Sequence, residues 1–205
     1  MSKEVRIYLE GGGDSSNGRS LLRNGFDAFL SIVKNEARKR RMRWSTIACG
    51  SRQDAYRNFL HALEDHPEAL NLLVVDSEAP VKQAPDQHLI SRDGWNALKD
   101  VDADRCHLMV QVMESWLITD KAAVKQYYGQ GFRPNQIPDT KNVEKLTKRR
   151  VDSAIKNASS KTKKGKYHKI KHASALLGRV DPQKVRKVAS HCDRFLNHLE
   201  DYIGM

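Results

Sequence analysis

LNLLVVDSEAP (residues 70–80) contains a continuous apolar run, Leu72–Val75, that is followed at once by Asp76 and Glu78. An uninterrupted apolar run of this length is typical of a parallel strand that helices cover on both faces. Strands of this kind form the centre of α/β sheets. The stretch therefore predicts a buried central strand whose carboxyl end presents two acids.

The chain before this strand alternates between strand and helix patterns. Val5–Leu9 and Arg43–Cys49 are rich in β-branched and aromatic residues and favour strands. Between them, Leu21–Val33 has apolar residues at helical spacing, which predicts an amphipathic helix. Ser51 is a suitable N-cap for a second helix that runs to Asp65.

The alternation continues after the central strand. His107–Val112 predicts a fourth strand, and Glu114–Tyr128 predicts a helix. Between them, residues 77–104 form a long irregular segment with an isolated Trp95, and connections of that length are often functional. Strands that alternate with helices indicate right-handed crossovers, so we expect an α/β fold with a mostly parallel sheet flanked by helices.

The character of the chain changes after Gly129. Lys141–His172 contains twelve lysines and arginines against two acids, so ten of the eleven net positive charges lie there. Pro182–Tyr202 predicts a final amphipathic helix. We therefore expect a sheet domain over residues 1–130 and a basic helical extension over residues 131–205 that packs on it.

The composition narrows the class of protein. A net charge of +11 and a pI near 9.6 favour a polyanionic partner such as nucleic acid. No stretch has the ~20 apolar residues of a membrane span, and the first residues lack the pattern of a signal peptide, so we expect a cytoplasmic protein. Cys49, Cys106 and Cys192 form no CxxC pair, which argues against a zinc site or a disulfide framework.

Acids follow two of the predicted strands. Glu10 ends the first strand and Asp14 follows one turn later, while Asp76 and Glu78 end the third. Ligands of open parallel sheets bind beyond the carboxyl ends of the strands. If the first and third strands are neighbours, four carboxylates meet there and repel one another unless a cation is present. Oxygen ligands of this kind suit Mg²⁺ or Mn²⁺.

This metal hypothesis sets two conditions on the structure. Glu10 and Asp76 must lie close together, and no lysine or arginine must occupy the space between them. A plainer interpretation stays open, because an acid after a strand is common and the loop GGGDSSNG (residues 11–18) suits a turn with an N-cap. The loop also lacks the Gly-Lys-Ser/Thr ending of a phosphate-binding loop.

The order of these acids resembles the Toprim fold, which topoisomerases, primases and the overcoming-lysogenization-defect nucleases share. That family has a glutamate at the end of its first strand and an Asp-x-Asp pair after a later strand. Glu10 and Asp14 match the Glu-Gly-x-x-Asp pattern of its nuclease branch, and Asp76 matches the first acid of the pair. Glu78 departs from the second acid but keeps a carboxylate. The resemblance implies a Toprim or Rossmann-like fold and a Mg²⁺-dependent nuclease.

Longer stretches resemble a bacterial family of small Toprim-like proteins that often occur with ATPase partners in phage defence. They are LEGGGDS, LLVVDSEAP, HLMVQVMESWLITD and KKGKYHKIKHASALL. In the nuclease branch a glutamate-bearing helix follows the Asp-x-Asp strand, and Met113–Trp116 resembles that element. This resemblance implies that Glu114 is a further metal ligand or an orienting residue, with Asp120 as a weaker candidate. It also implies a nuclease effector with an ATPase partner. For Trp116 we expect packing in the core.

The basic stretch 163–172 is the expected grip on nucleic acid. Lysines give salt-dependent contacts with phosphates, and an aromatic ring among them can stack on an unpaired base. The expected nucleic-acid contacts are Lys163, Lys164, Lys166, Tyr167, Lys169, Lys171 and His172. The alternative is a solvated run of charges in which Tyr167 and His172 pack against the domain.

The resulting hypothesis is hydrolysis of a phosphodiester with one or two metal ions. The expected metal ligands are Glu10, Asp14, Asp76, Glu78 and Glu114. The expected catalytic residues are Glu10, Asp76 and Glu78, with His168 for proton transfer and Lys166 for charge stabilisation. Two alternatives remain: a non-catalytic nucleic-acid-binding or regulatory subunit, and nucleotidyl transfer of the primase kind.

Overall fold

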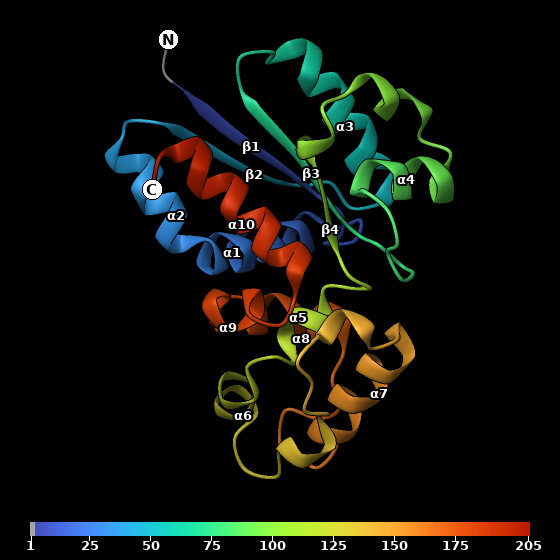
Figure 1. Cartoon of the computed structure of the whole chain (residues 1–205). Helices are drawn as coiled ribbons and strands as arrows, with labels where there is room; N and C mark the ends of the chain where they lie inside the picture. The colour runs from blue at the N-terminus through green and yellow to red at the C-terminus, as the bar shows by residue number, and fades with distance from the viewer. Residues whose placement is uncertain (1–2) are drawn as a thin grey trace.

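Four strands form one sheet in the order β2-β1-β3-β4, and every neighbouring pair is parallel (Figure 1). The computed structural model describes residues 3–205. The strands are β1 (Glu4–Leu9), β2 (Arg43–Ala48), β3 (Leu70–Asp76) and β4 (Cys106–Met109). The predicted α/β class and the parallel sheet are confirmed, and β3, the stretch with the apolar run, is buried along its whole length.

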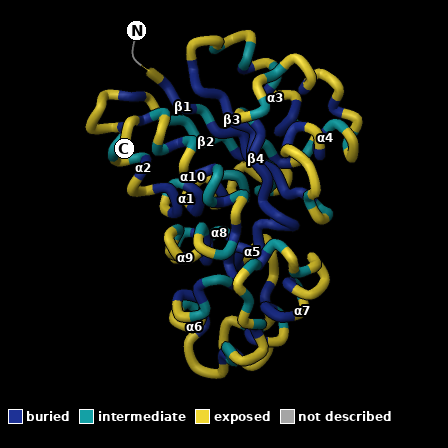
Figure 2. Tube along the Cα trace, viewed as in Figure 1, coloured by how far each residue is buried: buried dark blue, intermediate teal, exposed yellow. Residues whose placement is uncertain are grey.

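Helices cover both faces of this sheet. One face packs against α1 (Ser16–Phe29), α2 (Ser31–Lys39) and α10 (Ser190–Ile203). The other packs against α3 (Arg52–Asp65) and α4 (Pro85–Asp93). Successive side chains of a strand point to opposite faces, so Leu72 and Val74 join the first core while Leu73 and Val75 join the second. Figure 2 shows the strands as the buried centre of this arrangement.

The remaining helices gather beyond the carboxyl ends of the strands (Figure 1). They are α5 (Glu114–Leu117), α6 (Lys121–Tyr128), α7 (Lys148–Ser159), α8 (Lys169–Leu177) and α9 (Pro182–Arg186). Short 3-10 turns are η1 (Asn96–Asp100), η2 (Ala103–Arg105), η3 (Pro134–Gln136) and η4 (Val143–Lys145). One core cluster runs from the sheet into these helices, so residues of both predicted segments share it.

Three expected helices are interrupted. The first divides at Leu30 into α1 and α2. The helix expected over residues 114–128 divides into α5 and α6, because the Asp120 side chain accepts a hydrogen bond from the backbone of Ala123 and begins α6 there. The last one divides into α9 and α10. Local periodicity detected the helical segments but not these caps.

Two other expectations concern single residues. The Ser51 side chain accepts a hydrogen bond from the backbone N–H of Asp54, which confirms it as the N-cap of α3. Trp116 is fully buried and stacks on Phe29, with ring centroids 5.4 Å apart, which confirms packing in the core. Within residues 3–205, the helices are too short or too polar for any of them to cross a bilayer.

Helix α8 lies unusually close to α1. A Cβ atom on Gly25 of α1 would come within 2.5 Å of the carbonyl oxygen of Ser174 in α8. The glycine therefore permits the backbones to touch. This contact sets the position of α8, whose first turn carries Lys169 and Ile170.

Gly25→Ala should destabilise the protein by about 1–3 kcal/mol, because the added methyl group forces α8 away from α1. A helical glycine without such a contact behaves in the opposite way, since alanine there stabilises by about 0.4–1 kcal/mol. Urea unfolding followed by circular dichroism measures the difference. Asn24→Ala, at the exposed neighbouring position, is the control and should be neutral or slightly stabilising. A stabilised Gly25→Ala variant would contradict the close contact.

Candidate functional site

The carboxyl ends of β1 and β3 lie side by side at the centre of the sheet. The chain leaves β1 toward β2 on one side, while β3 and β4 lie on the other, so a topological switch point falls between β1 and β3. Ligand sites of open α/β sheets occur at such points. Glu10, Asp76 and Glu78 meet here, with carboxylate oxygens within 4.8 Å of one another. The first condition of the metal hypothesis is therefore met.

The backbone conformation of the loop after Glu10 requires glycine. Gly11, Gly12 and Gly13 have φ angles of +115°, +88° and +63°, which favour glycine. A Cβ on Gly12 would also come within 2.7 Å of the backbone of Arg19. This turn leads the chain away from the sheet edge.

Asp14 therefore does not join the cluster of acids. It is exposed at the end of the turn, and its backbone carbonyl accepts a hydrogen bond of 3.0 Å from Arg19. The expectation that four carboxylates of the two strands meet is corrected to three. The pattern of the sequence could not show the direction of a turn made of three glycines with positive φ.

Asp76 is the most buried acid of the cluster, with 3% of its surface exposed. Its Oδ1 accepts a hydrogen bond of 2.7 Å from the backbone N–H of Met113, and its Oδ2 lies 3.4 Å from Nζ of Lys169. Burial, together with the charges of Glu10 and Glu114, raises the pKa of Asp76 to about 7, although Lys169 opposes this. The neighbouring basic groups therefore compensate the carboxylate only in part.

Glu78 reaches the cluster through a bend rather than an extended continuation of β3. Its φ angle of +60° is unusual for a residue with a side chain. Its backbone N–H donates to the carbonyl of Gln111 at 2.8 Å, which holds the bend. The Glu78 carboxylate forms an ion pair with Lys148 at the start of α7.

Arg52, in the first turn of α3, is the most firmly held basic residue of the site. Its Nη1 donates to Oε2 of Glu10 at 2.8 Å and also to the backbone carbonyl of Asp76. Its Nε and Nη2 form a two-point ion pair with Asp93 at 3.0 and 2.8 Å. The guanidinium also lies 5.1 Å from the ring centre of Trp95. The long segment 77–104 therefore acts on the site by fixing Arg52.

Lys169 links the cluster to Glu114. Its Nζ lies 3.8 Å from Oε2 of Glu114 as well as near Asp76. The Tyr167 hydroxyl donates to Oε1 of Glu114 at 2.9 Å, so this buried carboxylate has two partners. Glu114 lies beside the cluster but is not among the acids whose oxygens converge.

The second condition of the metal hypothesis is not met. Arg52 contacts both Glu10 and the backbone of Asp76, and Lys169 contacts the Asp76 carboxylate. A cation would therefore have to displace at least one basic side chain. The side chains of Lys169 and Lys148 are 55% and 52% exposed, whereas that of Arg52 is only 17% exposed. The two lysines are therefore the ones with room to move.

Most of the basic stretch 163–172 lies outside the site. Lys163, Lys164, Lys166, His168 and Lys171 are exposed and do not line the cavity, so the expected catalytic roles of Lys166 and His168 find no support in their position. The first turn of α8 instead directs Lys169 inward.

Tyr167 and His172 are buried, which corrects the expectation that they contact nucleic acid. The Tyr167 hydroxyl is engaged by Glu114. Nδ1 of His172 lies 3.0 Å from the Tyr128 hydroxyl and accepts a hydrogen bond from the backbone N–H of His168. The alternative interpretation, in which both residues pack against the domain, fits the structure.

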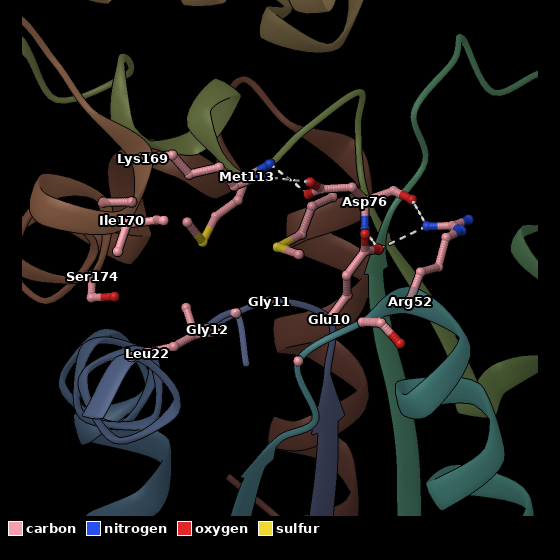
Figure 3. A pocket seen from close by; sticks show the side chains of 16 residues that line it. Glu10, Gly11, Gly12, Leu22, Arg52, Asp76, Met113, Lys169, Ile170 and Ser174 are labelled. Atoms are coloured by element: carbon pink, nitrogen blue, oxygen red, sulfur yellow. Dashed lines mark hydrogen bonds and ion pairs between the residues drawn. The ribbon is translucent and has the colours of Figure 1, made fainter. Parts of the chain in front are cut away.

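A cavity of about 200 Å³ opens beside the acids. Glu10, Arg52 and Asp76 form one side of it, as Figure 3 shows. The glycine loop and the first turn of α8 form the opposite side. The site thus combines three carboxylates, three basic groups and an adjoining space for a ligand.

A protein-family model described as a domain of unknown function, DUF4276, matches residues 9–200. The chain belongs to the DUF4276 family. No curated protein and no solved structure matched it. The matched residues run from the end of β1 into α10 and include every residue of the site described above. The family description assigns no activity, so the resemblance to Toprim nucleases stays a prediction.

Sequence reasoning missed three basic residues of this DUF4276 site. The sequence pattern places Arg52 only in a helix, Lys148 only in a charge run, and Lys169 only among the expected contacts with nucleic acid. Arg52 had a usable signal, because it directly follows the N-cap Ser51 at the same edge of the sheet. Lys148 and Lys169 had none, since their positions depend on how α7 and α8 pack.

Asp76→Asn should stabilise the protein near pH 8 and have less effect near pH 5, with divalent ions removed by a chelator. The folded pKa of about 7 lies above the ordinary 3.8. The contribution of Asp76 to stability is therefore present at low pH and is lost as the pH rises through that window. The amide keeps an oxygen for the Met113 N–H without carrying a charge. Melting temperatures at the two pH values measure the effect.

The control is Asp139→Asn, because the Asp139 side chain is 97% exposed. Its melting temperature should follow that of the unsubstituted protein at both pH values. An Asp76→Asn variant that is less stable than the unsubstituted protein near pH 8 would show that Lys169 compensates the carboxylate fully.

Proposed function

We propose that this DUF4276 protein is a metal-dependent phosphodiesterase of the Toprim type that cleaves nucleic acid. The observation that carries the proposal is the convergence of Glu10, Asp76 and Glu78 at the switch point of a parallel sheet, with carboxylate oxygens within 4.8 Å. The order of these acids along the chain, which resembles that of Toprim nucleases, supports it.

The donor set fits a hard divalent cation. All three groups offer carboxylate oxygens, which Mg²⁺ and Mn²⁺ prefer. The raised pKa of Asp76 also supports cation binding, because burial leaves this carboxylate short of positive charge. Glu10, Asp76 and Glu78 would hold the ion, and Glu114 would orient Lys169. A bound ion supplies positive charge beside the phosphate and lowers the pKa of attacking water.

The basic residues have a role in binding the substrate. Arg52 is oriented by Asp93 and Trp95, so its guanidinium meets a phosphate without reorganising. With a cation bound by the acids, Lys148 and Lys169 would be released from their carboxylates and would be free to donate to phosphate oxygens. Stabilising the charge of the transition state in this way falls to Lys169 rather than to Lys166.

The excess of positive charge supports nucleic acid as the substrate. Both basic helices contribute one lysine to the site, Lys148 from α7 and Lys169 from α8. Exposed arginines follow Lys148 in sequence, and exposed lysines lie on both sides of Lys169. Contacts of this kind bind the backbone without regard to sequence. Exposed residues in these stretches are Arg149, Arg150, Lys163, Lys164, Lys166 and Lys171.

A second candidate is a nucleic-acid-binding or regulatory subunit without catalysis. The observation that favours it is that each of the three carboxylates already has a basic partner: Arg52 for Glu10, Lys169 for Asp76 and Lys148 for Glu78. In this case the acids orient the basic groups for phosphate and bind no metal. Metal binding distinguishes the two functions.

The resemblance extends the proposal to the setting of the protein. We expect it to act in the cytoplasm as the effector of a phage-defence system with an ATPase partner. A nuclease without control would damage its own cell, so a partner that switches it on is a reasonable requirement.

Asp76→Ala should abolish both Mn²⁺ binding and cleavage, because it removes the central ligand of the cluster. Isothermal titration with Mn²⁺ measures binding, and the degradation of labelled DNA and RNA with Mg²⁺ or Mn²⁺ measures cleavage. Asp14→Ala is the matched control, since Asp14 is an exposed acid on the neighbouring loop, and it should retain both. If Asp76→Ala leaves Mn²⁺ binding unchanged, the second candidate, a binding or regulatory subunit without catalysis, is favoured.

Lys148→Ala should tighten Mn²⁺ binding by roughly twofold to fivefold, because the ammonium group competes with the ion for Glu78 across a half-exposed pair. The same change should slow cleavage, because a phosphate contact is lost. Lys145→Ala, an exposed lysine without a partner in the cluster, is the control for general loss of charge. Weaker Mn²⁺ binding in Lys148→Ala would mean that Lys148 supports the ion rather than competing with it.

A further inference from the structure

The cavity beside the acids has two chemically different halves. Glu10, Arg52 and Asp76 line the polar half. The other half, between α1 and α8, is mainly apolar (Figure 3). Its apolar residues are Leu22, Met109, Met113, Ile170 and Ala173. The phosphodiesterase proposed above uses only the polar half and leaves the apolar half without a role.

Asp76 lies deeper than the other two acids of the cluster, since the side chains of Glu10 and Glu78 are 19% and 22% exposed. Asp76 is 3% exposed, and its carboxylate faces the cavity rather than the outer surface. A phosphodiester that approaches it must therefore bring part of the attached nucleoside into the cavity. The regular backbone of a duplex keeps its bases paired inside, so a duplex cannot place a nucleoside there without unpairing it.

The size of the cavity limits what it can hold. About 200 Å³ is smaller than the roughly 300–1,000 Å³ of pockets for drug-sized ligands, which limits the ligand to a group smaller than these and excludes a base pair. The faces of a nucleobase are apolar and polarisable, and methionine sulfur makes favourable contacts with such rings. Met113 and Ile170 offer the matching surface.

Ile170 supports this assignment independently. Its side chain is 69% exposed although it lies next to Lys169 in the first turn of α8. It projects toward the cavity, opposite Met113 (Figure 3). An exposed apolar side chain between a basic residue and a cavity suits a ligand that is charged at one end and flat and apolar at the other.

We infer that the cavity receives a single unpaired nucleotide, with its phosphate at Arg52 and beside the cation that Glu10 and Asp76 would hold, and with its base against Leu22, Met113 and Ile170. The inference rests on the proposed function and names its substrate class: nucleic acid with an unpaired nucleotide, in a single strand or at an end. The same chemistry is present in a free mononucleotide, and the experiment separates the two sources.

The experiment measures binding by fluorescence anisotropy, with Ca²⁺ in place of Mg²⁺ to limit cleavage of the probes. The probes are a single strand of about ten nucleotides, the same strand in a duplex, and a strand of equal length and charge without bases. A nucleoside monophosphate serves as competitor. Ile170→Asn removes the apolar contact without adding charge. Ile32→Asn is the matched control, because Ile32 is also an exposed isoleucine, 61% exposed, but lies on α2 away from the cavity.

The single strand should bind more tightly than the duplex and the strand without bases. Ile170→Asn should weaken binding of the single strand by roughly threefold to tenfold and leave the strand without bases unaffected. Ile32→Asn should match the unsubstituted protein on every probe. The monophosphate should compete only weakly, because it lacks the backbone contacts of the exposed lysines.

Equal binding of the duplex, or an equal effect of Ile170→Asn on both single strands, would overturn the inference. A monophosphate that binds as tightly as the strand and depends on Ile170 in the same way would assign the cavity to a free nucleotide instead. If binding depends on the bases but no metal supports cleavage, the inference about the cavity stands and the proposed phosphodiesterase activity is contradicted. If the protein cleaves duplex and Ile170→Asn does not change the rate, the phosphodiesterase activity stands and the inference about the cavity is contradicted.

Discussion

The buried carboxylate of Asp76 is the constraint around which the rest of the site is arranged. A charge removed from water is costly unless hydrogen bonds and opposite charges replace its hydration. Here the backbone of Met113 and the ammonium of Lys169 contact its two oxygens. These partners come from segments that follow β4 and begin α8, so the helices beyond the sheet are tied to this one group.

Two kinds of basic residue surround the acids, and they differ in freedom. Arg52 is held at three of its nitrogens by Glu10 and Asp93, and its side chain is largely buried. Lys148 and Lys169 each reach the cluster through a long side chain that is half exposed. A fixed guanidinium suits recognition of a phosphate, while movable lysines can give way to a cation. The arrangement therefore fits the proposed binding of a cation and a phosphate at one place.

Much of the fold followed from local pattern. The apolar run of β3 identified a central strand, and the acids that follow β1 and β3 were found because strand ends are visible in sequence. Glu10, Asp76 and Glu78 meet as expected. Asp14 does not, since three positive-φ glycines turn it away, and Tyr167 is buried where a surface contact was expected. The first correction concerns the direction of a turn and the second the packing of a distant segment, and local periodicity determines neither.

The sequence by itself determined which segments are strands, which acids stand at their ends, and that positive charge gathers in the last third of the chain. These features depend on neighbouring residues and on the repeat of helices and strands. Only the tertiary structure decided that Arg52, Lys148 and Lys169 would be the partners of the acids. Each pairing joins residues from elements far apart in the chain, and the packing of α3, α7 and α8 sets which basic side chain points inward. In α8 that packing depends on Gly25, where a missing Cβ lets two helices touch.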